Sequence, residues 1–569
     1  MPPGIFFIFK FVQKPLFATI LVYSLRNFLL TGNQPSSLTW SFLYCIYPIS
    51  VFVRGTIRGI RRKREMKELG AREFPSVHSN LPMGISIMYK SVQGFLHSQL
   101  GEIATAWQEQ YGSTFSIEVL GDYSIVTFEP EHIKNMLSTN FDNFEKGPRF
   151  REMFRLVLGN GVFNADGDIW KFHRAMTRPF FVRDRVTDFD IFDRHADIAV
   201  NKMIERLSEG EPIDFQDVMS RLTLDSATEF LFGSCVHSLA APLPYAHNSP
   251  RKTDDNNKVL HKNDRFAKAL AEAQAETALR TKLGDLWPLR DIFGDRIQDS
   301  MAIINEYIDP ILQEALENRK PNGGDTRAEN LQGGPETLLS HLVQETDDID
   351  IIRDEVINIM LAGRDTHPDV LATLRHEILT KIGLNRPTFD DLKECKYLRA
   401  VINETLRLYP PAPFNVRASI DSTTWKAKDG GKPYYVPAGC FVAYSVFVMH
   451  RRKDLWGPDG IYFNFTQIFG IHCHSQLAAL EYDPNRFLDE RVHKFAYNQT
   501  SFVLVRLLQA FDTITLDVDA QPSDSRPPPE WKGRSGVPRD EKIWMKSHLT
   551  LYAYKGLWLR MTFANQSIQ

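Results

Sequence analysis

Apolar residues recur at intervals of three and four over most of the chain, the spacing that places them on one face of a helix. Such patterns predict long helices over 193–207, 215–231 and 303–316. Between these patterns lie segments rich in polar residues, Gly and Pro, and we expect a surface loop over 240–263 and a linker over 320–335.

Alternation of apolar and polar residues, which is typical of strands, is confined to short stretches. Two of them, 114–119 and 123–128, flank Gly121-Asp122, and this arrangement predicts a β-hairpin. Helical patterns dominate the rest, so we expect a large, predominantly α-helical α+β domain over 65–569.

The first 64 residues have a different pattern. Residues 4–30 are apolar but interrupted by charges, and 38–53 is a cleaner apolar run, somewhat short of the ~20 residues of a spanning helix. Because basic flanks stay on the cytosolic side, we expect 1–64 to be a membrane anchor and basic linker, with the main domain in the cytosol. The basic cluster that follows the apolar run comprises Arg54, Arg58, Arg61, Arg62, Lys63 and Arg64.

Three forms of membrane attachment fit this pattern: one span, a hairpin, or a helix lying in the interface. A cleaved signal peptide is a further alternative, but no small-residue cleavage site precedes the charges. The sequence leaves the choice among the three forms open.

Composition and charge narrow the class of protein. The 569 residues are 43% hydrophobic and 24% charged, as in a folded globular protein, and the net charge of −3 gives no field that favours nucleic acid. The wide cysteine spacing disfavours a disulfide framework or a structural zinc site, and fits a reducing compartment. The five cysteines are Cys45, Cys235, Cys395, Cys440 and Cys473.

The first motif with chemical meaning runs from residue 161 to 174. Asp166 or Asp168 is expected to cap the helix that follows. Trp170 and Arg174 then lie four residues apart on one face, where an indole N–H beside a guanidinium can bind a carboxylate or propionate. The alternative is an ordinary buried tryptophan over a solvated arginine.

In the second motif, 351–366, apolar residues recur at helical spacing. The run ends in small residues that are followed by an acidic residue and a hydroxyl residue. Gly363 inside a buried helix would allow another group to approach the backbone closely. Asp365 and Thr366 could relay protons to an oxygen species. The alternative is a helix that simply ends at a C-terminal glycine.

The third motif supplies a charged pair, and the fourth supplies one further arginine. Glu404 and Arg407 face the same side of a predicted helix and can pair, and prolines end that helix just before Arg417. The E-x-x-R motif alone carries little information. The same motif followed by Pro-Pro-x-Pro and an arginine is much rarer in protein sequences, and is therefore more informative. The loop 483–487 offers one further arginine, Arg486.

In this order and at these separations, the four motifs resemble the cytochrome P-450 superfamily of heme-thiolate monooxygenases, from about residue 74 to 562. The chain is most similar to fungal microsomal alkane- and fatty-acid-hydroxylase-like members. The resemblance implies a P-450 fold with small β-sheets and heme b as cofactor. It also implies electrons from NADPH through a membrane-bound flavoprotein reductase, a lipophilic small-molecule substrate, and attachment to the endoplasmic reticulum membrane.

The resemblance also implies roles for single residues around the heme. Trp170 and Arg174 would contact one propionate, and Arg417 the other. Gly363 would lie over the distal face of the ring.

Two further roles follow from the same resemblance. Asp365 and Thr366 would deliver protons to dioxygen on the distal side. Glu404, Arg407 and Arg486 would form a buried charge triad that is structural rather than catalytic.

The sequence departs from the family pattern at three places. After Thr366 it passes directly to His367-Pro368, which the family shows only at the start of a later helix, so a segment of the distal helix is missing. The run 460–478 is an insertion foreign to the family, either a membrane-touching loop or translated intron sequence. Its His-Cys-His triplet is a poor metal site because neighbouring side chains in an extended strand point apart.

The third departure concerns the axial ligand. The family carries a Phe-x-x-Gly-x-x-x-Cys-x-Gly loop before its last long helix, but here Lys494 runs directly into Phe495, where that helix is predicted to start. The axial thiolate drives O–O cleavage in such enzymes, and the resemblance places no other cysteine under the iron. Two hypotheses follow: a membrane-anchored monooxygenase whose sequence carries exon-boundary errors, or a catalytically inactive relative that keeps the scaffold.

Overall fold

A computed structural model describes residues 3–7, 53, 56–97, 100–177, 189–252, 262–317, 339, 342, 369–456, 495–531 and 542–564. Several predicted features lie outside these residues: most of the anchor, the linker 320–335, the distal residues 363–368 and the insertion 460–478. The basic residues from Arg58 to Arg64 lie on a described helix over 56–68.

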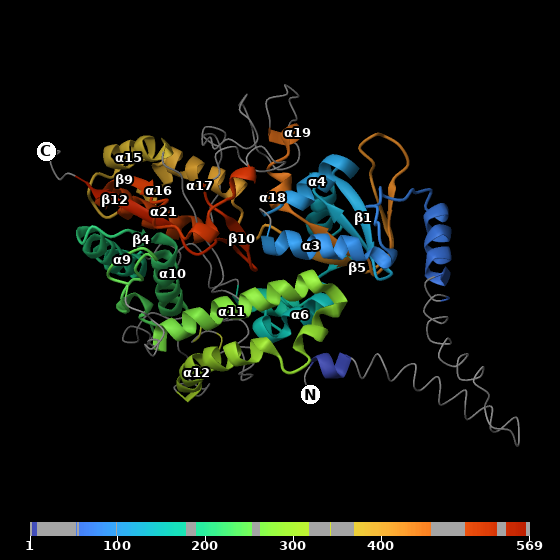
Figure 1. Cartoon of the computed structure of the whole chain (residues 1–569), viewed down its shortest axis with the longest axis horizontal. Helices are drawn as coiled ribbons and strands as arrows, with labels where there is room; N and C mark the ends of the chain where they lie inside the picture. The colour runs from blue at the N-terminus through green and yellow to red at the C-terminus, as the bar shows by residue number, and fades with distance from the viewer. Residues whose placement is uncertain are drawn as a thin grey trace, which may run out of the picture.

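A five-stranded sheet forms one end of the molecule (Figure 1). Its first two strands, β1 (Thr114–Val119) and β2 (Asp122–Thr127), pair in antiparallel register, and the predicted hairpin is confirmed. Leu120 and Gly121 form the turn with φ values of 54° and 78°, the left-handed conformation that a tight hairpin turn needs. The sheet has the order β1-β2-β8-β5-β3, and its other strands are β8 (Phe441–Tyr444), β5 (Asn415–Ser419) and β3 (Phe144–Glu145).

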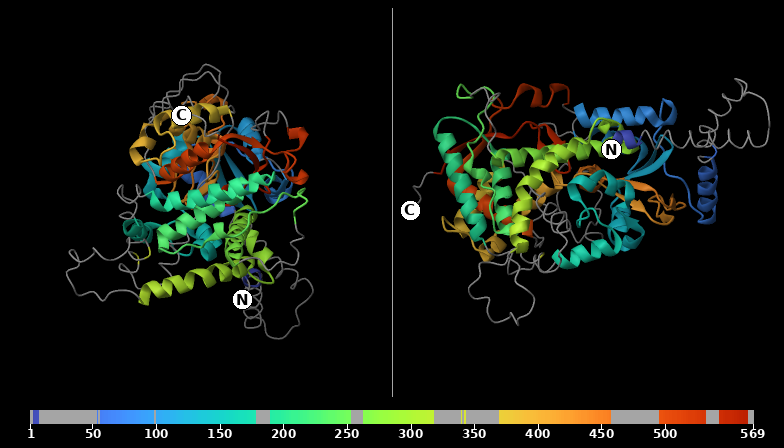
Figure 2. Two further views of the ribbon diagram at one scale, coloured as in Figure 1. Left: turned by 90° about the vertical axis from the view of Figure 1, so that its left-hand side faces the viewer. Right: turned by 90° about the horizontal axis from the view of Figure 1, so that it is seen from below.

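The three long helices predicted from apolar spacing are confirmed as α9 (Asp190–Ser208), α10 (Phe215–Phe232) and α12 (Arg296–Glu317). Figures 1 and 2 show that helices make up most of the molecule around the small sheets. The remaining α-helices are α3 (Ile85–His97), α4 (Glu102–Tyr111), α5 (Pro130–Lys134), α6 (Gly147–Leu158), α7 (Gly167–Thr177), α11 (Lys262–Leu283), α15 (Asp369–Lys381), α16 (Phe389–Glu394), α17 (Lys396–Leu408), α18 (Val446–Met449), α19 (Lys453–Trp456) and α21 (Phe495–Ala510).

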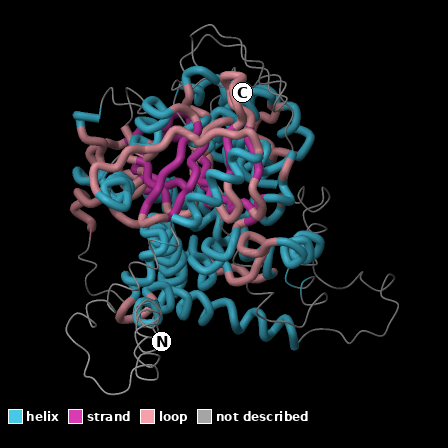
Figure 3. Tube along the Cα trace, turned by 90° about the vertical axis from the view of Figure 1, so that its right-hand side faces the viewer, coloured by secondary structure: helices cyan, strands magenta, loops and turns pink. Residues whose placement is uncertain are grey.

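Three smaller sheets complete the described strands. Figure 3 shows strands, in magenta, with helices below and beside them. One has three strands in the order β4-β12-β9, and two are hairpins, β6–β7 and β10–β11. Their bounds are β4 (Ile213–Asp214), β9 (Phe511–Leu516), β12 (Trp558–Phe563), β6 (Thr423–Trp425), β7 (Tyr434–Val436), β10 (Met545–Ser547) and β11 (Leu551–Ala553). Helices with small sheets confirm the predicted fold class.

Apolar side chains gather in three main clusters. One joins α9, α10, α15, α17 and α21 with the β9–β12 sheet. A second joins α6, α10, α11 and α12, and a third lies against the five-stranded sheet. The E-x-x-R helix α17 belongs to the first cluster, so its charged side chains are held within a packed core.

Among the described residues, no helix combines the length and the apolar character needed to cross a membrane. The apolar run 38–53 falls almost entirely outside those residues.

Candidate functional site

The predicted pair Glu404–Arg407 forms within the core. Both side chains are on α17 and are at most 1% exposed. Arg407 donates from Nε to Oε2 and from Nη2 to Oε1 of Glu404, each at 2.7 Å, and from Nη1 to the backbone oxygen of His450 at 2.8 Å. This bidentate arrangement is the strong form of a carboxylate–guanidinium pair. Arg486, the third member of the predicted triad, lies outside the described residues.

His450 completes this buried polar cluster and was not predicted from the sequence. Its Nδ1 lies 3.1 Å from the backbone oxygen of Arg407, which accepts its hydrogen bond, so each residue binds the other's backbone. Burial, together with the charges of Arg407 and Arg451, lowers the pKa of His450 to about 4. The histidine is therefore neutral in the folded protein at neutral pH.

The lowered pKa of His450 predicts that acid weakens the fold. Below pH 6.5 the unfolded chain binds a proton at this histidine that the folded chain takes up only near pH 4, so stability falls as the pH drops through this window. We expect a loss of roughly 2 kcal/mol between pH 7 and pH 5 from this group, measured by urea unfolding.

The control for this prediction is His548, because burial also lowers its pKa to about 4 and it titrates in the same window. His450→Asn and His548→Asn should each remove a separate part of the pH dependence, and the double variant should remove both. An unchanged pH slope in His450→Asn would contradict the assignment.

Helix α7 carries Trp170 and Arg174, as predicted, but its predicted cap is wrong. The Asp166 carboxylate accepts hydrogen bonds from the backbone N–H groups of Lys146 (2.8 Å) and Gly147 (3.0 Å), and pairs with Arg151. It therefore caps α6 rather than α7. Asp168 is equally not a cap, because it lies in the first turn of α7 and pairs with Lys171.

The two predicted propionate ligands on α7 differ in exposure. Trp170 is half-buried, with its ring 5.5 Å from that of Phe141, whereas Arg174 is exposed. No carboxylate among the described residues forms an ion pair with Arg174.

Arg417 on β5 is close to the start of α6 and α7. The strand β3 leads into Lys146 and pairs with β5, and the Lys146 ammonium donates to backbone oxygens of Val162 (3.1 Å) and Ala165 (2.5 Å). Burial lowers the pKa of Lys146 to about 8, with further lowering by the positive charge of Arg417. Lys146 therefore links the junction of β3 and α6 to the segment that precedes α7, through contacts that no local sequence pattern indicates.

Arg417 resembles Arg174 in having no acidic partner among the described residues. Its side chain donates to the backbone oxygen of Val416 at 2.7 Å and to the amide oxygen of Asn415 at 3.4 Å. A half-buried guanidinium with only neutral partners is a suitable site for an acidic group.

The distal residues Gly363, Asp365 and Thr366 lie outside the described residues. Helix α15 (Asp369–Lys381) lies where the sequence predicts a later helix. Helix α21 (Phe495–Ala510) confirms a helix over the residues where the one after the missing loop is expected.

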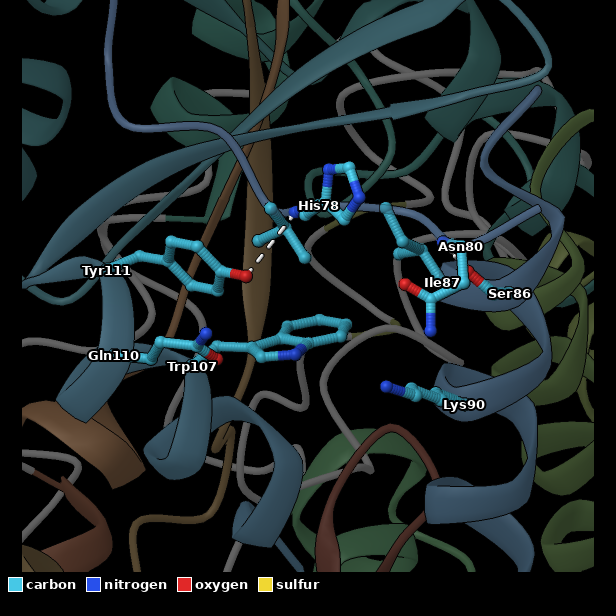
Figure 4. Close-up of a pocket in the computed structure, with 9 residues that line it drawn as sticks. His78, Asn80, Ser86, Ile87, Lys90, Trp107, Gln110 and Tyr111 are labelled. Atoms are coloured by element: carbon cyan, nitrogen blue, oxygen red, sulfur yellow. Dashed lines mark hydrogen bonds between the residues drawn. The ribbon is translucent and has the colours of Figure 1, made fainter. Parts of the chain in front are cut away.

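Figure 4 shows a pocket of about 210 Å³ between α3 and α4. Lys90, Gln110 and Tyr111 are among the mainly polar side chains that line it, and the Tyr111 hydroxyl accepts a 3.4 Å hydrogen bond from the backbone of His78. Pockets for drug-sized ligands are roughly 300–1,000 Å³. None of the predicted site residues lines this pocket, so it is separate from the candidate site.

Comparison with known proteins identifies the family. A profile described as Cytochrome P450 matches residues 79–466. Cytochrome P450 monooxygenase g430 of a Fusarium species is 33% identical over 506 residues, which cover 84% of this chain and 85% of that protein. Cytochrome P450 monooxygenase himC of Aspergillus japonicus is 32% identical and covers 78% of each chain. Cytochrome P450 52A5 of Candida maltosa is 33% identical, covering 71% of this chain and 78% of the relative.

The chain therefore belongs to the cytochrome P450 family. By family it is a heme-thiolate monooxygenase, whose class inserts one oxygen atom from dioxygen into a lipophilic substrate. The family uses heme, and its electrons come from NADPH through a redox partner.

Three described side chains have the donor chemistry that heme propionates need. Arg174 and Arg417 are cationic groups without acidic partners in the described chain, and Trp170 lies one helical turn from Arg174. These three side chains suit the two propionates. The heme would supply oxygen activation when bound.

The axial side does not fit. Cys440 is buried at the start of β8 with its sulfur 3.7 Å from the backbone oxygen of Tyr123, and Cys395 is buried between α16 and α17. Burial raises the pKa of both thiols, to about 12 and about 11, and also that of Cys235, to about 12. The resemblance places none of these three described cysteines under the iron, so none of them is in position as the axial ligand.

Proposed function

We propose that the gene for this chain encodes a microsomal monooxygenase that hydroxylates a lipophilic, aliphatic substrate, and that the chain as written cannot turn over. Residues 1–64 would anchor it in the endoplasmic reticulum membrane, with residues 65–569 on the cytosolic side. A membrane-bound flavoprotein reductase would supply the electrons. The single observation that carries the proposal is a family match across most of the chain combined with the absence of the axial cysteine loop.

The roles of single residues are part of this proposal. Trp170 and Arg174 would hold one propionate and Arg417 the other, while Gly363 would allow close approach of the distal helix. Asp365 and Thr366 would hold and relay protons on the distal side. The buried pair Glu404–Arg407 supports the structural part of the proposal, with Arg486 as the expected third member.

One feature supports exon-boundary errors as the origin of the departures. The family match ends at residue 466, within the foreign run 460–478.

Sequencing of the transcript tests this proposal. We expect reads that encode a Phe-x-x-Gly-x-x-x-Cys-x-Gly loop between Lys494 and Phe495 and that lack codons 460–478. Reads that reproduce the printed sequence would instead establish the alternative, an inactive relative that keeps the scaffold.

A further inference from the structure

A cluster of three metal-ligating side chains lies away from the candidate heme residues. His195 is on α9, Glu229 is near the end of α10, and Cys235 follows that helix. One possible ligand atom from each lies within 4.8 Å of the other two. Imidazole nitrogen, carboxylate oxygen and thiolate sulfur are the ligand types of protein zinc sites. We propose that His195, Glu229 and Cys235 bind a zinc ion, with solvent in the fourth position.

The fold holds these ligands close together. Helices α9 and α10 pack against each other, as Figures 1 and 2 show. Gly233 ends α10 with a φ of 70°, which turns the chain back toward the helix. Beyond Cys235, the N–H of Val236 donates to the Thr228 hydroxyl at 3.3 Å, and the Asp225 carboxylate accepts from two further backbone N–H groups. The thiol is therefore carried by a short segment anchored at both ends.

In this structure a direct hydrogen bond joins two of the proposed ligands. His195 Nε2 lies 2.6 Å from Glu229 Oε2, and Nδ1 of the same imidazole, buried, has no hydrogen-bond partner in the described chain. Two ligands on one zinc at bonds of about 2.0–2.1 Å lie roughly 3.3 Å apart. A small side-chain rotation, which replaces the shared proton by the metal, would provide this separation.

Neighbouring groups suit a metal with these ligands. Arg194 donates to Glu229 Oε1 at 2.6 Å, which leaves Oε2 for the metal and orients the carboxylate. The Cys235 sulfur accepts a 3.2 Å hydrogen bond from the N–H of His237, a contact that supports a thiolate. Such outer contacts position ligands and tune their affinity.

The local charge favours a divalent cation. The carboxylates of Asp225 and Glu229 both act electrostatically on Cys235. With the thiolate and the single positive charge of Arg194, they leave a net charge of about −2, which Zn²⁺ would neutralise.

Cobalt(II) titration of the full-length, detergent-solubilised chain after chelator treatment tests the proposal. Thiolate ligation of Co²⁺ gives a sulfur-to-metal charge-transfer band in the near ultraviolet. We expect this band to saturate near one equivalent and to disappear when Zn²⁺ is added. Cys235→Ser should abolish the band, and Glu229→Gln should weaken Zn²⁺ binding by at least about tenfold.

The matched control is Cys473→Ser, because Cys473 is another cysteine next to histidines, His472 and His474, in a triplet whose spacing makes it a poor metal site. This variant should keep the band and its stoichiometry. Circular dichroism would establish that each variant is folded. A band that persists in Cys235→Ser, a band lost in Cys473→Ser, or no band in the unmodified chain would overturn the proposal.

Discussion

Insertion of a Phe-x-x-Gly-x-x-x-Cys-x-Gly loop between Lys494 and Phe495 is expected to create a thiolate-type reduced-CO spectrum that the chain as written lacks. The physical reason is the axial ligand: the thiolate gives the iron of this family its characteristic electronic structure. The loop would be taken from a relative such as cytochrome P450 52A5 of Candida maltosa, with residues 460–478 deleted in the same variant. Both chains would be expressed with heme precursor and compared after reduction under CO.

The control for this experiment is the same inserted loop with serine in place of its cysteine. That variant restores length and loop packing but not the thiolate, so it should fail to give the thiolate-type spectrum. A clear thiolate-type spectrum from the chain as written would show that one of its five cysteines reaches the iron. The surroundings of Cys395 and Cys440 argue against this, since both are buried thiols with raised pKa values.

Local patterns were sufficient to predict much of the fold. The β1–β2 hairpin follows from alternation and from the glycine between the strands, although the turn is at Leu120-Gly121 rather than at the predicted Gly121-Asp122. Helices α9, α10 and α12 follow from apolar spacing, because both signals depend on residues close in the chain. The Glu404–Arg407 pair was predictable for the same reason, since both residues lie on one helix three positions apart.

Contacts between distant segments could not be predicted in this way. Asp166 was expected to cap the helix that follows it, but its carboxylate turns to α6, because Lys146 and Gly147 present backbone N–H groups there. The cluster of His195, Glu229 and Cys235 depends on α9 packing against α10 and on the turn at Gly233. No spacing rule along the sequence reports either arrangement.

Removing one partner of the buried Glu404–Arg407 pair is expected to lower the free energy of unfolding more than the other substitutions do. Glu404→Ala leaves the Arg407 guanidinium buried without its carboxylate, and Arg407→Ala leaves the Glu404 carboxylate without its two 2.7 Å hydrogen bonds. Each side chain is at most 1% exposed, so water cannot replace the lost partner. We expect a loss of about 3–5 kcal/mol in each case, because the remaining buried charge keeps its desolvation cost after losing this bidentate partner.

Urea unfolding followed by circular dichroism would measure this loss as a lower midpoint or as failure to obtain folded protein. Glu68→Ala is the matched control, because the Arg64–Glu68 pair has a similar 2.9 Å contact but side chains that are 81% and 60% exposed. An exposed pair on a helix contributes only about 0.5 kcal/mol. Arg407→Lys should fall between the two, since an ammonium cannot make the bidentate contact. Equal effects of Glu404→Ala and Glu68→Ala would show that burial of the pair does not determine its contribution.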